Sequence, residues 1–154
     1  MKIVVQKSLN ASVSVDNKIV GKIDHGMVVL VGFTEGDTQA DIEYLANKLV
    51  NLRIYTDENG KMNNSILDTK GQILSISQFT LYADTKKGNR PSYVNALESS
   101  QAEILYQKWN EVLKTKIEVV ETGIFGTDMQ VSLINDGPVT IILESRDKKW
   151  WKIN

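Results

Sequence analysis

Residues 73–84 bring polar side chains into a segment that otherwise has the composition of a β-strand. Its other residues are mainly β-branched, apolar or aromatic, and the turn signal Lys70-Gly71 stands just before it. The polar side chains are those of Ser75, Ser77, Gln78 and Thr80. Polar groups near a core cost about 1–3 kcal/mol each unless they form hydrogen bonds. Either the fold satisfies them, as on an edge strand with a solvated face, or the strand end presents Ser77, Gln78 and Thr80 to a substrate.

Histidine and cysteine limit the chemistry that these polar residues could perform. His25 is the one histidine, and it stands in Asp24-His25-Gly26, which predicts a turn between two strands. A Ser-His-Asp triad would have to use it. The absence of cysteine excludes disulfides, thiolate catalysis and zinc–thiolate sites. No acidic pair has metal-ligand spacing, and there is no glycine-rich phosphate loop. We therefore expect a site with no metal and no cofactor, and, in a hydrolase, no histidine base.

A second unusual stretch is Asn135-Asp136-Gly137-Pro138. Asparagine, aspartate, glycine and proline between two predicted strands indicate a turn. About 5–6% of X–Pro bonds in folded proteins are cis, and a cis bond here would let both carbonyls point the same way from a rigid tip. Phe125 and Met129, near a glycine-punctuated loop, are candidates for a pocket wall or for the core.

A basic loop follows the polar strand directly. Residues 84–92 contain Lys86, Lys87 and Arg90. Because the formal net charge of the chain is −1, an attraction to nucleic acid would have to come from a local patch such as this one. The loop is either an ordinary solvated loop or a cationic flank that binds RNA phosphates.

The pattern of elements predicts one domain of the α+β class. A chain of 154 residues suits a single core, and the short turns favour antiparallel pairing. We expect a mostly antiparallel curved sheet or partial barrel, with two long helices packed on it. The expected strands are residues 2–7, 11–16, 18–23, 27–33, 53–56, 73–84, 117–121, 129–134 and 139–144.

Capping boxes and helical periodicity place the two helices. Thr38 with Asp41 marks the first start, and Ser100 with Glu103 marks the second, which runs to about residue 116. The first helix should bury Ile42, Leu45, Ala46, Leu49 and Leu52. The second should bury Leu105, Trp109, Val112 and Lys116, with Ile104 and Leu113 beside them.

Nothing in the sequence indicates a membrane or secretory protein. No apolar run approaches the ~18 residues of a membrane span, and the first residues are too soon polar for a signal peptide. A cytoplasmic location is the expectation.

Two motifs together resemble those of the D-aminoacyl-tRNA deacylases, the D-tyrosyl-tRNA(Tyr) deacylase family. They are Ser77-Gln78-Phe79-Thr80 and residues 135–140, Asn-Asp-Gly-Pro-Val-Thr. The resemblance runs to about Glu144, which sets residues 1–145 as a single deacylase domain and 146–154, with Trp150-Trp151, as a C-terminal tail. Shorter matches are Ala11-Ser12-Val13, Gly60-Lys61-Met62-Asn63, Tyr82-Ala83-Asp84, Gly88, Arg90-Pro91-Ser92, Thr122-Gly123, Phe125 and Asp128-Met129-Gln130-Val131.

The resemblance implies an editing esterase that acts on tRNA. Such enzymes hydrolyse the ester between a D-amino acid and the 3′-terminal ribose of tRNA, and they also remove glycine from alanine tRNA. They are homodimers in which the Gly-Pro tip of each subunit is cis and enters the pocket of the other. Carried over, the carbonyls of Gly137 and Pro138 would hold the substrate amino group and leave no room for an L side chain. Glycine would escape such a filter.

The resemblance also implies a role for each residue at the site. Gln78, Phe79 and Thr80 would be catalytic, and Ser77, Phe125 and Met129 would shape the substrate pocket. The backbone N–H groups of Phe79 and Thr80 are candidate oxyanion donors. Because Thr80 has no neighbouring base, we favour an attacking water over a threonine nucleophile. The strand would position this water, with the RNA 2′-hydroxyl as a second candidate.

One residue departs from the family pattern. The family reads Gln-Arg-Val near its start, where the arginine braces the tip, whereas this chain reads Gln6-Lys7-Ser8. Lysine lacks the planar fork of arginine, so Lys7 stands at the bracing position without the bidentate geometry of an arginine. A non-catalytic binder of aminoacylated RNA ends and a structural dimer with a wet cleft are the alternatives to an enzyme.

Overall fold

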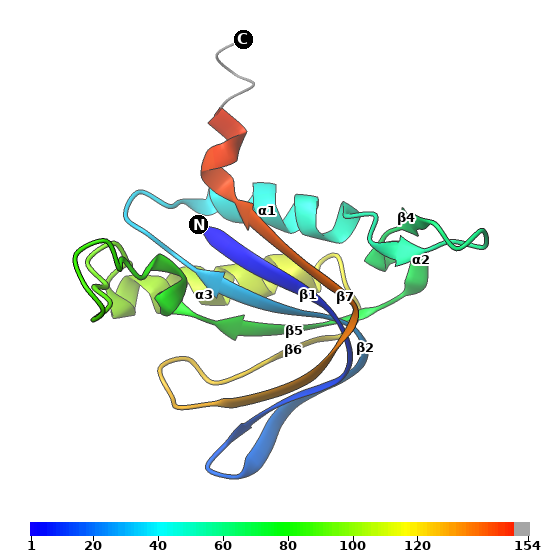
Figure 1. The fold of residues 1–154 in the computed structure, drawn as a ribbon, viewed down its shortest axis with the longest axis horizontal. Helices are drawn as coiled ribbons and strands as arrows, with labels where there is room; N and C mark the ends of the chain where they lie inside the picture. The colour runs from blue at the N-terminus through cyan, green and yellow to red at the C-terminus, as the bar shows by residue number, and fades with distance from the viewer. Residues whose placement is uncertain (150–154) are drawn as a thin grey trace.

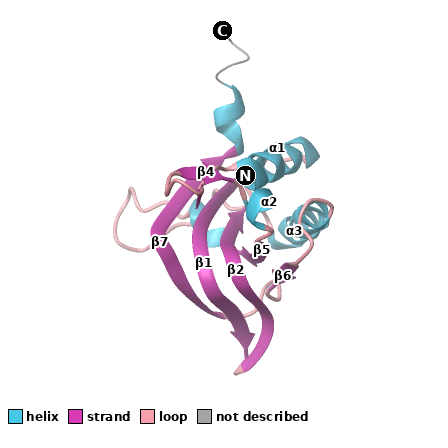
Figure 2. Ribbon diagram, turned by 90° about the vertical axis from the view of Figure 1, so that its right-hand side faces the viewer, coloured by secondary structure: helices cyan, strands magenta, loops and turns pink. Residues whose placement is uncertain are grey.

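The computed structural model describes residues 1–149, whose main feature is a curved five-stranded sheet with helices on one side (Figure 1). The strands lie in the order β6-β5-β2-β1-β7. Figure 2 shows α1 and α3 on the same face of this sheet. The main elements are β1 (Lys2–Val15), β2 (Lys18–Gly32), α1 (Gln39–Asn51), β5 (Gln72–Ser77), α3 (Ser99–Lys114), β6 (Val120–Thr122) and β7 (Gln130–Glu144).

The α+β class is confirmed, but the sheet is mixed. β1 pairs antiparallel with β2 and β7, whereas β2–β5 and β5–β6 are parallel pairs. A parallel pair needs a crossover of a dozen or more residues, usually through a helix. Here α1 lies between β2 and β5, and α3 lies between β5 and β6. The helices thus explain the parallel pairs, and the expectation of a mostly antiparallel sheet or a partial barrel is not confirmed.

The first hairpin is longer than the sequence predicts. Its turn at Asp16-Asn17 has the expected left-handed backbone, with φ of 49° and 65°. The second predicted turn, at Asp24-His25-Gly26, is wrong because β2 continues through it and His25 pairs with Leu9. Gly26 serves close packing instead, since a Cβ there would lie 1.8 Å from the carbonyl oxygen of Gln72 on β5.

The sheet is buried on both faces where β2 and β5 run side by side. Alternate residues of a strand point to opposite faces, and those of β2 divide between two clusters. Met27, Val29 and Val31 belong to the main core, with the fully buried Trp109 of α3. Val28 joins a smaller cluster on the opposite face, which contains Ala11, Val13, Ile23, Leu74 and Ile76. This arrangement explains the nearly continuous apolar run at residues 27–33.

The first helix begins and packs as expected. The Asp41 carboxylate accepts hydrogen bonds from the backbone N–H of Thr38, at 2.8 Å, and from its hydroxyl, at 3.2 Å. Ile42, Leu45, Ala46 and Leu49 are buried as predicted, whereas Leu52 lies beyond the helix as its C-cap and is only partly buried.

The second long helix begins one residue before the expected range, and its buried stripe agrees with the prediction only in part. Trp109 and Leu113 are buried as expected, and Leu105 and Val112 are partly buried against the core. Its N-cap is Glu98, whose carboxylate accepts from the N–H groups of Ser100 and Gln101, so the Ser100–Glu103 capping box is wrong. The buried residues are Ala102, Tyr106, Trp109, Asn110 and Leu113, whereas Ile104 is 55% exposed. Lys116, which follows the helix, does not belong to its buried stripe.

Residues 53–69 contain more structure than predicted. β3 (Tyr55–Thr56) and β4 (Met62–Asn64) form a small separate sheet, and α2 (Ile66–Thr69) follows it. α2 begins with a capping box in which the Asp68 carboxylate accepts from the Ser65 N–H at 2.8 Å.

The C-terminal end of the described chain is a short 3₁₀ helix, η2 (Ser145–Lys149). The division into residues 1–145 and 146–154 stays a prediction, and Trp150-Trp151 lie outside the described residues. No helix within residues 1–149 is both long and apolar enough to cross a membrane.

Replacing Asp41 by alanine should lower the free energy of unfolding at pH 7 by about 1 kcal/mol, the usual worth of an N-terminal cap. Burial raises the pKa of Asp41, but the hydrogen bonds from Thr38 and Ser145, together with the positive charge of the N-terminus, hold the pKa below its ordinary value. The stabilisation is therefore present above the ordinary pKa and is lost as the pH falls through the lowered one. Urea unfolding of wild type and Asp41→Ala at pH 7 and in acid measures this loss.

Glu111→Ala, on the exposed side of α3, is the matched control and should change stability little. Equal stability of wild type and Asp41→Ala at pH 7 would contradict the assigned cap. So would a stability difference that is as large in acid as at pH 7.

Candidate active site

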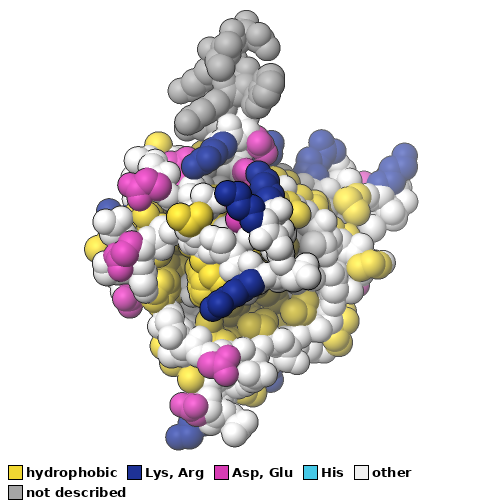
Figure 3. Space-filling model, turned by 60° about the vertical axis from the view of Figure 1, so that its left-hand side comes forward, with side chains coloured by type: hydrophobic (Ala, Val, Ile, Leu, Met, Phe, Trp, Pro, Cys, Tyr) yellow, Lys and Arg dark blue, Asp and Glu magenta, His cyan; other side chains and the backbone are white. Residues whose placement is uncertain are grey.

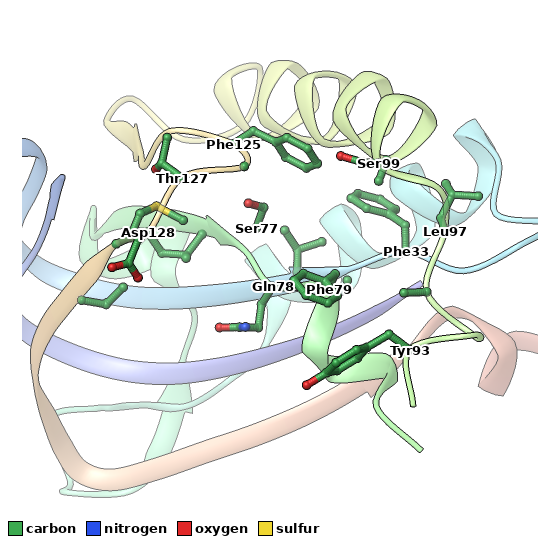
Figure 4. Close-up of a pocket in the computed structure, with 18 residues that line it drawn as sticks. Phe33, Ser77, Gln78, Phe79, Tyr93, Leu97, Ser99, Phe125, Thr127 and Asp128 are labelled. Atoms are coloured by element: carbon green, nitrogen blue, oxygen red, sulfur yellow. The ribbon is translucent and has the colours of Figure 1, made fainter. Parts of the chain in front are cut away.

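A pocket of about 560 Å³ opens where β5 ends against the start of α3 (Figure 4). Its walls come from the ends of β2 and β5, the segment 93–99, the first turn of α3 and the loop 125–129. Most lining side chains are apolar or aromatic, and a few polar ones face inward among them. That composition is typical of a small-molecule or cofactor site.

The structure brings together residues that the sequence analysis assigned from two distant segments. Ser77, Gln78 and Phe79 line one side of the pocket, and Phe125 and Met129 line the other. Thr80 does not line it and is exposed. It nevertheless joins the group, because the Gln78 Nε2 donates a 2.5 Å hydrogen bond to the Thr80 Oγ1.

The strand that carries these residues stops at Ser77, so its predicted extension to residue 84 is wrong. The Gln78 N–H still donates to the Val31 carbonyl at 2.7 Å, and then the chain turns into the 3₁₀ helix η1 (Phe79–Tyr82). Gly32 makes room for this turn. A Cβ at Gly32 would lie 2.9 Å from the Gln78 carbonyl oxygen and 3.2 Å from the Leu81 Cβ.

The turn presents backbone donors. Phe79 and Thr80 are the first two residues of η1, and the first N–H groups of a helix have no partner within it. Lys2 ties the same helix to the sheet. Its ammonium donates to the Leu81 carbonyl at 3.3 Å and lies 5.0 Å from the Tyr82 ring centroid.

The opposite wall packs closely against a glycine. A Cβ at Gly123 would lie 2.4 Å from the Met129 sulfur, so the flexible Met129 side chain would have to shift to make room for a larger residue. Tyr106 supports the wall from α3. Its ring centroid lies 5.9 Å from that of Phe125, and its hydroxyl donates to the Ser75 carbonyl at 2.7 Å. Burial raises the pKa of Tyr106, which keeps the hydroxyl protonated as a donor at neutral pH.

Several lining residues were missed by the sequence analysis. Asp128 is the one formally charged side chain among the lining residues, and it lay unrecognised within a quoted family motif. Tyr93 directly follows Arg90-Pro91-Ser92, another quoted motif. Phe33, Leu97 and Ser99 gave no signal of their own, because apolar residues and a helix-start serine are ordinary fold residues.

Gly137-Pro138 is a tip on a single strand and not the turn of a hairpin. Ser8 pairs with Asn135 and Gln6 pairs with Thr140, so residues 136–139 leave the ladder opposite β1. Asn135 closes the tip, since its Oδ1 accepts from the Val139 N–H at 3.0 Å and its Nδ2 donates to the Thr140 hydroxyl at 2.9 Å. The Gly137–Pro138 peptide bond is cis. Both residues are exposed and do not line the pocket of their own chain.

Lys7 lies beside this tip. Its ammonium is 3.4 Å from the Asp136 carboxylate and 5.4 Å from the Tyr55 ring centroid. The Tyr55 hydroxyl in turn donates to the Gly26 carbonyl at 2.7 Å. The cation therefore contacts the residue that precedes Gly137.

The three basic residues lie in an exposed loop outside the pocket lining. Asp84 and Ser92 close the loop with two backbone hydrogen bonds of 2.8 Å. Within residues 1–149, neither Lys86 nor Lys87 nor Arg90 forms an ion pair. In the same range no group of three His, Cys, Asp or Glu side chains is placed to hold a metal ion.

Known proteins are similar to this chain in sequence and in fold. A D-aminoacyl-tRNA deacylase of Bacillus velezensis is 56% identical over 95% of this chain and 99% of its own. That of Bacillus cytotoxicus is 57% identical over 95% of this chain and 100% of its own.

Two solved structures have the same fold. One, titled c-Myc DNA Unwinding Element Binding Protein, has a TM-score of 0.89 and 42% identity, with 94% of this chain and 98% of that chain covered. A probable eukaryotic D-amino acid tRNA deacylase has a TM-score of 0.80 over 93% of this chain and 98% of its own, and its 16% identity speaks for the fold alone. The model of the family described as D-Tyr-tRNA(Tyr) deacylase matches residues 4–144. The resemblance stated from the motifs is thus confirmed, and the chain belongs to the D-Tyr-tRNA(Tyr) deacylase family.

Proposed function

We propose that this protein hydrolyses the ester of D-aminoacyl-tRNA and releases the free D-amino acid and tRNA. One observation carries the proposal. In a member of a deacylase family, Ser77–Phe79 from one of the two motifs and the segment Phe125–Met129, which holds shorter family matches, meet in one pocket large enough for the end of such a substrate. Relatives that share more than half of its residues bear the name D-aminoacyl-tRNA deacylase.

The chemistry proposed for the pocket needs positioning and no cofactor. Water attacks the ester carbonyl, and the N–H groups of Phe79 and Thr80 stabilise the developing oxyanion. The Gln78 amide donates to the Thr80 hydroxyl, so the two side chains form one oriented unit beside those donors. Ser77, Phe125 and Met129 hold the substrate. His25 pairs with Leu9 within the β1–β2 hairpin and does not line the pocket.

A homodimer would complete the site. Gly137 and Pro138 are exposed and lie outside the pocket of their own chain, so they are available to a second copy. β7 is an edge strand that also exposes Val131, Ile134 and Ile142. In the proposed dimer the tip enters the partner's pocket, its carbonyls bind the substrate amino group, and an L side chain is excluded. Glycine on alanine tRNA would pass the same filter and be removed.

The RNA body would lie against the basic loop. Lys86, Lys87 and Arg90 carry cations that no acidic side chain within residues 1–149 neutralises, and such residues bind phosphates. An enzyme that proofreads aminoacyl-tRNA works where tRNA is charged, and we place it in the cytoplasm.

The test of the function is the hydrolysis of D-tyrosyl-tRNA, L-tyrosyl-tRNA and glycyl-tRNA(Ala) by the purified protein. We expect release from the D and glycyl esters, with the L ester intact. Release from all three esters would support the esterase activity but would contradict the proposed exclusion of L-amino acids. If folded protein binds all three substrates but hydrolyses none of them, the protein is a binder of aminoacylated RNA ends and not an enzyme.

Thr80→Val should lower kcat on the order of 100-fold, the scale on which misplaced catalytic groups act. Valine keeps the shape and removes the hydroxyl that accepts from Gln78. Thr80→Ser keeps the hydroxyl and should retain most activity. Single-turnover kinetics and melting curves of both variants measure this. Equal kcat in Thr80→Val and wild type would show that the Thr80 hydroxyl has no role in catalysis. An acyl-enzyme trapped on Thr80 would show that the threonine, and not a water, is the nucleophile.

Lys7→Met should loosen the chiral filter, because it removes the ion pair with Asp136 next to the tip. We expect the ratio of D- to L-tyrosyl-tRNA hydrolysis to fall about tenfold, the effect of a charge-assisted contact worth roughly 1.5 kcal/mol. Lys7→Arg should preserve the ratio. Lys22→Met, at an exposed site on β2, is the control. An unchanged ratio in Lys7→Met would show that Lys7 does not brace the tip.

A further inference from the structure

Two exposed aromatic rings stand at the mouth of the pocket. Phe79 is 56% exposed and Tyr93 is 41% exposed. Their ring centroids are 5.0 Å apart and the planes meet at 69°, an edge-to-face pair. Both residues line the pocket, and Figure 4 shows Tyr93 at its edge with Phe79 beside it. A chain whose end enters the pocket on this side must pass these rings.

The basic loop is fixed to this aromatic pair. The two hydrogen bonds between Asp84 and Ser92 close the loop, and Tyr93 is the next residue after the closure. Between the closing residues the loop carries Lys86, Lys87 and Arg90 and no acidic residue. Asp84 itself accepts a hydrogen bond from the Lys86 backbone N–H at 2.9 Å. The loop that carries the cations is therefore closed directly before Tyr93, and Figure 3 shows Lys and Arg side chains beside exposed hydrophobic side chains on the face that it draws.

Exposed aromatic faces beside unpaired cations are the combination that binds single-stranded nucleic acid. Bases stack on the rings while the cations neutralise the backbone phosphates, and sequence matters little because every base has a π face. A duplex, whose bases are already stacked, would use the cations alone.

We propose that Tyr93, with Phe79 and the loop 84–92, forms a stacking site for the unpaired RNA nucleotides on the 5′ side of the terminal, aminoacylated one. We call these residues the Tyr93 platform. A base of the unpaired 3′ end stacks on the Tyr93 ring, and Lys86, Lys87 and Arg90 bind the adjoining phosphates. The assignment rests on the proposed function for the ester in the pocket, but binding at the platform does not require hydrolysis.

The exposed rings could instead contact a second copy of this chain. The three cations, which form no ion pair within residues 1–149, argue against it. They favour an anionic partner, and RNA supplies one negative charge per nucleotide.

The test measures binding of uncharged RNA and so stands apart from catalysis. The probes are a fluorescent RNA hairpin with an unpaired CCA 3′ end and the same hairpin with a blunt end. Fluorescence anisotropy gives Kd at several salt concentrations. Tyr93→Ala should weaken binding of the tailed hairpin on the order of tenfold or more, the range for one base stacked on an aromatic side chain. Tyr93→Phe should keep wild-type affinity, and Tyr93→Ala should leave blunt-hairpin binding unchanged.

The cations give a second, different signature. Lys86→Ala with Lys87→Ala should weaken binding of the tailed hairpin and flatten the dependence of log Kd on log salt by up to about 1.4, or ~0.7 for each lost single-strand phosphate contact. The matched control replaces Lys18 and Lys22, exposed cations of β2, and should change neither quantity.

Equal affinity of Tyr93→Ala and wild type for the tailed hairpin would overturn the platform. So would a shift of Tyr93→Ala from dimer to monomer in sedimentation with unchanged RNA affinity, because the ring would then belong to a contact between two copies. Since the RNA carries no amino acid, a wild type that binds the tail but hydrolyses no ester would refute the proposed function alone.

Discussion

The parallel pairing of β5 on β2 ends at one hydrogen bond, from the Gln78 N–H to the Val31 carbonyl, and the site depends on that end point. If β5 continued, Phe79 and Thr80 would lie in an extended strand and not at the start of η1. Because Gly32 has no side chain, the chain instead turns sharply against β2. The turn frees backbone donors beside the pocket and places Gln78 within hydrogen-bonding distance of Thr80.

The tip on β7 also forms where strand pairing is interrupted. Four residues leave the ladder while both halves of the strand continue to pair with β1, so the tip projects from a rigid base. Asn135 bonds across that base, and Lys7 holds the adjoining Asp136 carboxylate from β1. A lysine supplies a point charge where the resemblance leads us to expect the planar fork of an arginine. The Tyr55 ring near the same ammonium adds a cation–π contact, which limits where the lysine side chain can lie.

Local patterns predicted what local physics decides. The capping residues of α1, its buried face and the hairpin turn at Asp16-Asn17 follow from side-chain chemistry within a few residues. The motif residues Ser77, Gln78, Phe79, Phe125 and Met129 were assigned by resemblance, and the structure brings them into one pocket. Their roles in catalysis stay predictions.

Some misses were local, such as the cap of α3, which is Glu98 and not Ser100. Most of what else the sequence did not predict depends on distant partners. Gly32, more than forty residues earlier in the chain, leaves the space into which the chain turns where β5 ends. The predicted turn at residues 135–138 is a tip because both flanking segments pair with the same strand. The predicted turn at Gly26 is a close approach to Gln72. Asp128 and Tyr93 lie in exposed loops, where a charged or aromatic residue gives no periodic signal, and only the folded chain shows that they border the pocket.

The central claim, that one subunit's tip completes the other's site, is tested most directly by mixing subunits. Two differently tagged chains, one with Thr80→Val and one with Gly137→Val, are co-expressed and the mixed dimer is purified. Valine suits the backbone at Gly137 poorly because φ is +128° there. If the tip acts across the interface, the mixed dimer has one site with both parts intact and should recover about half the wild-type rate on D-tyrosyl-tRNA. A mixed dimer no more active than the two parent homodimers would contradict the account.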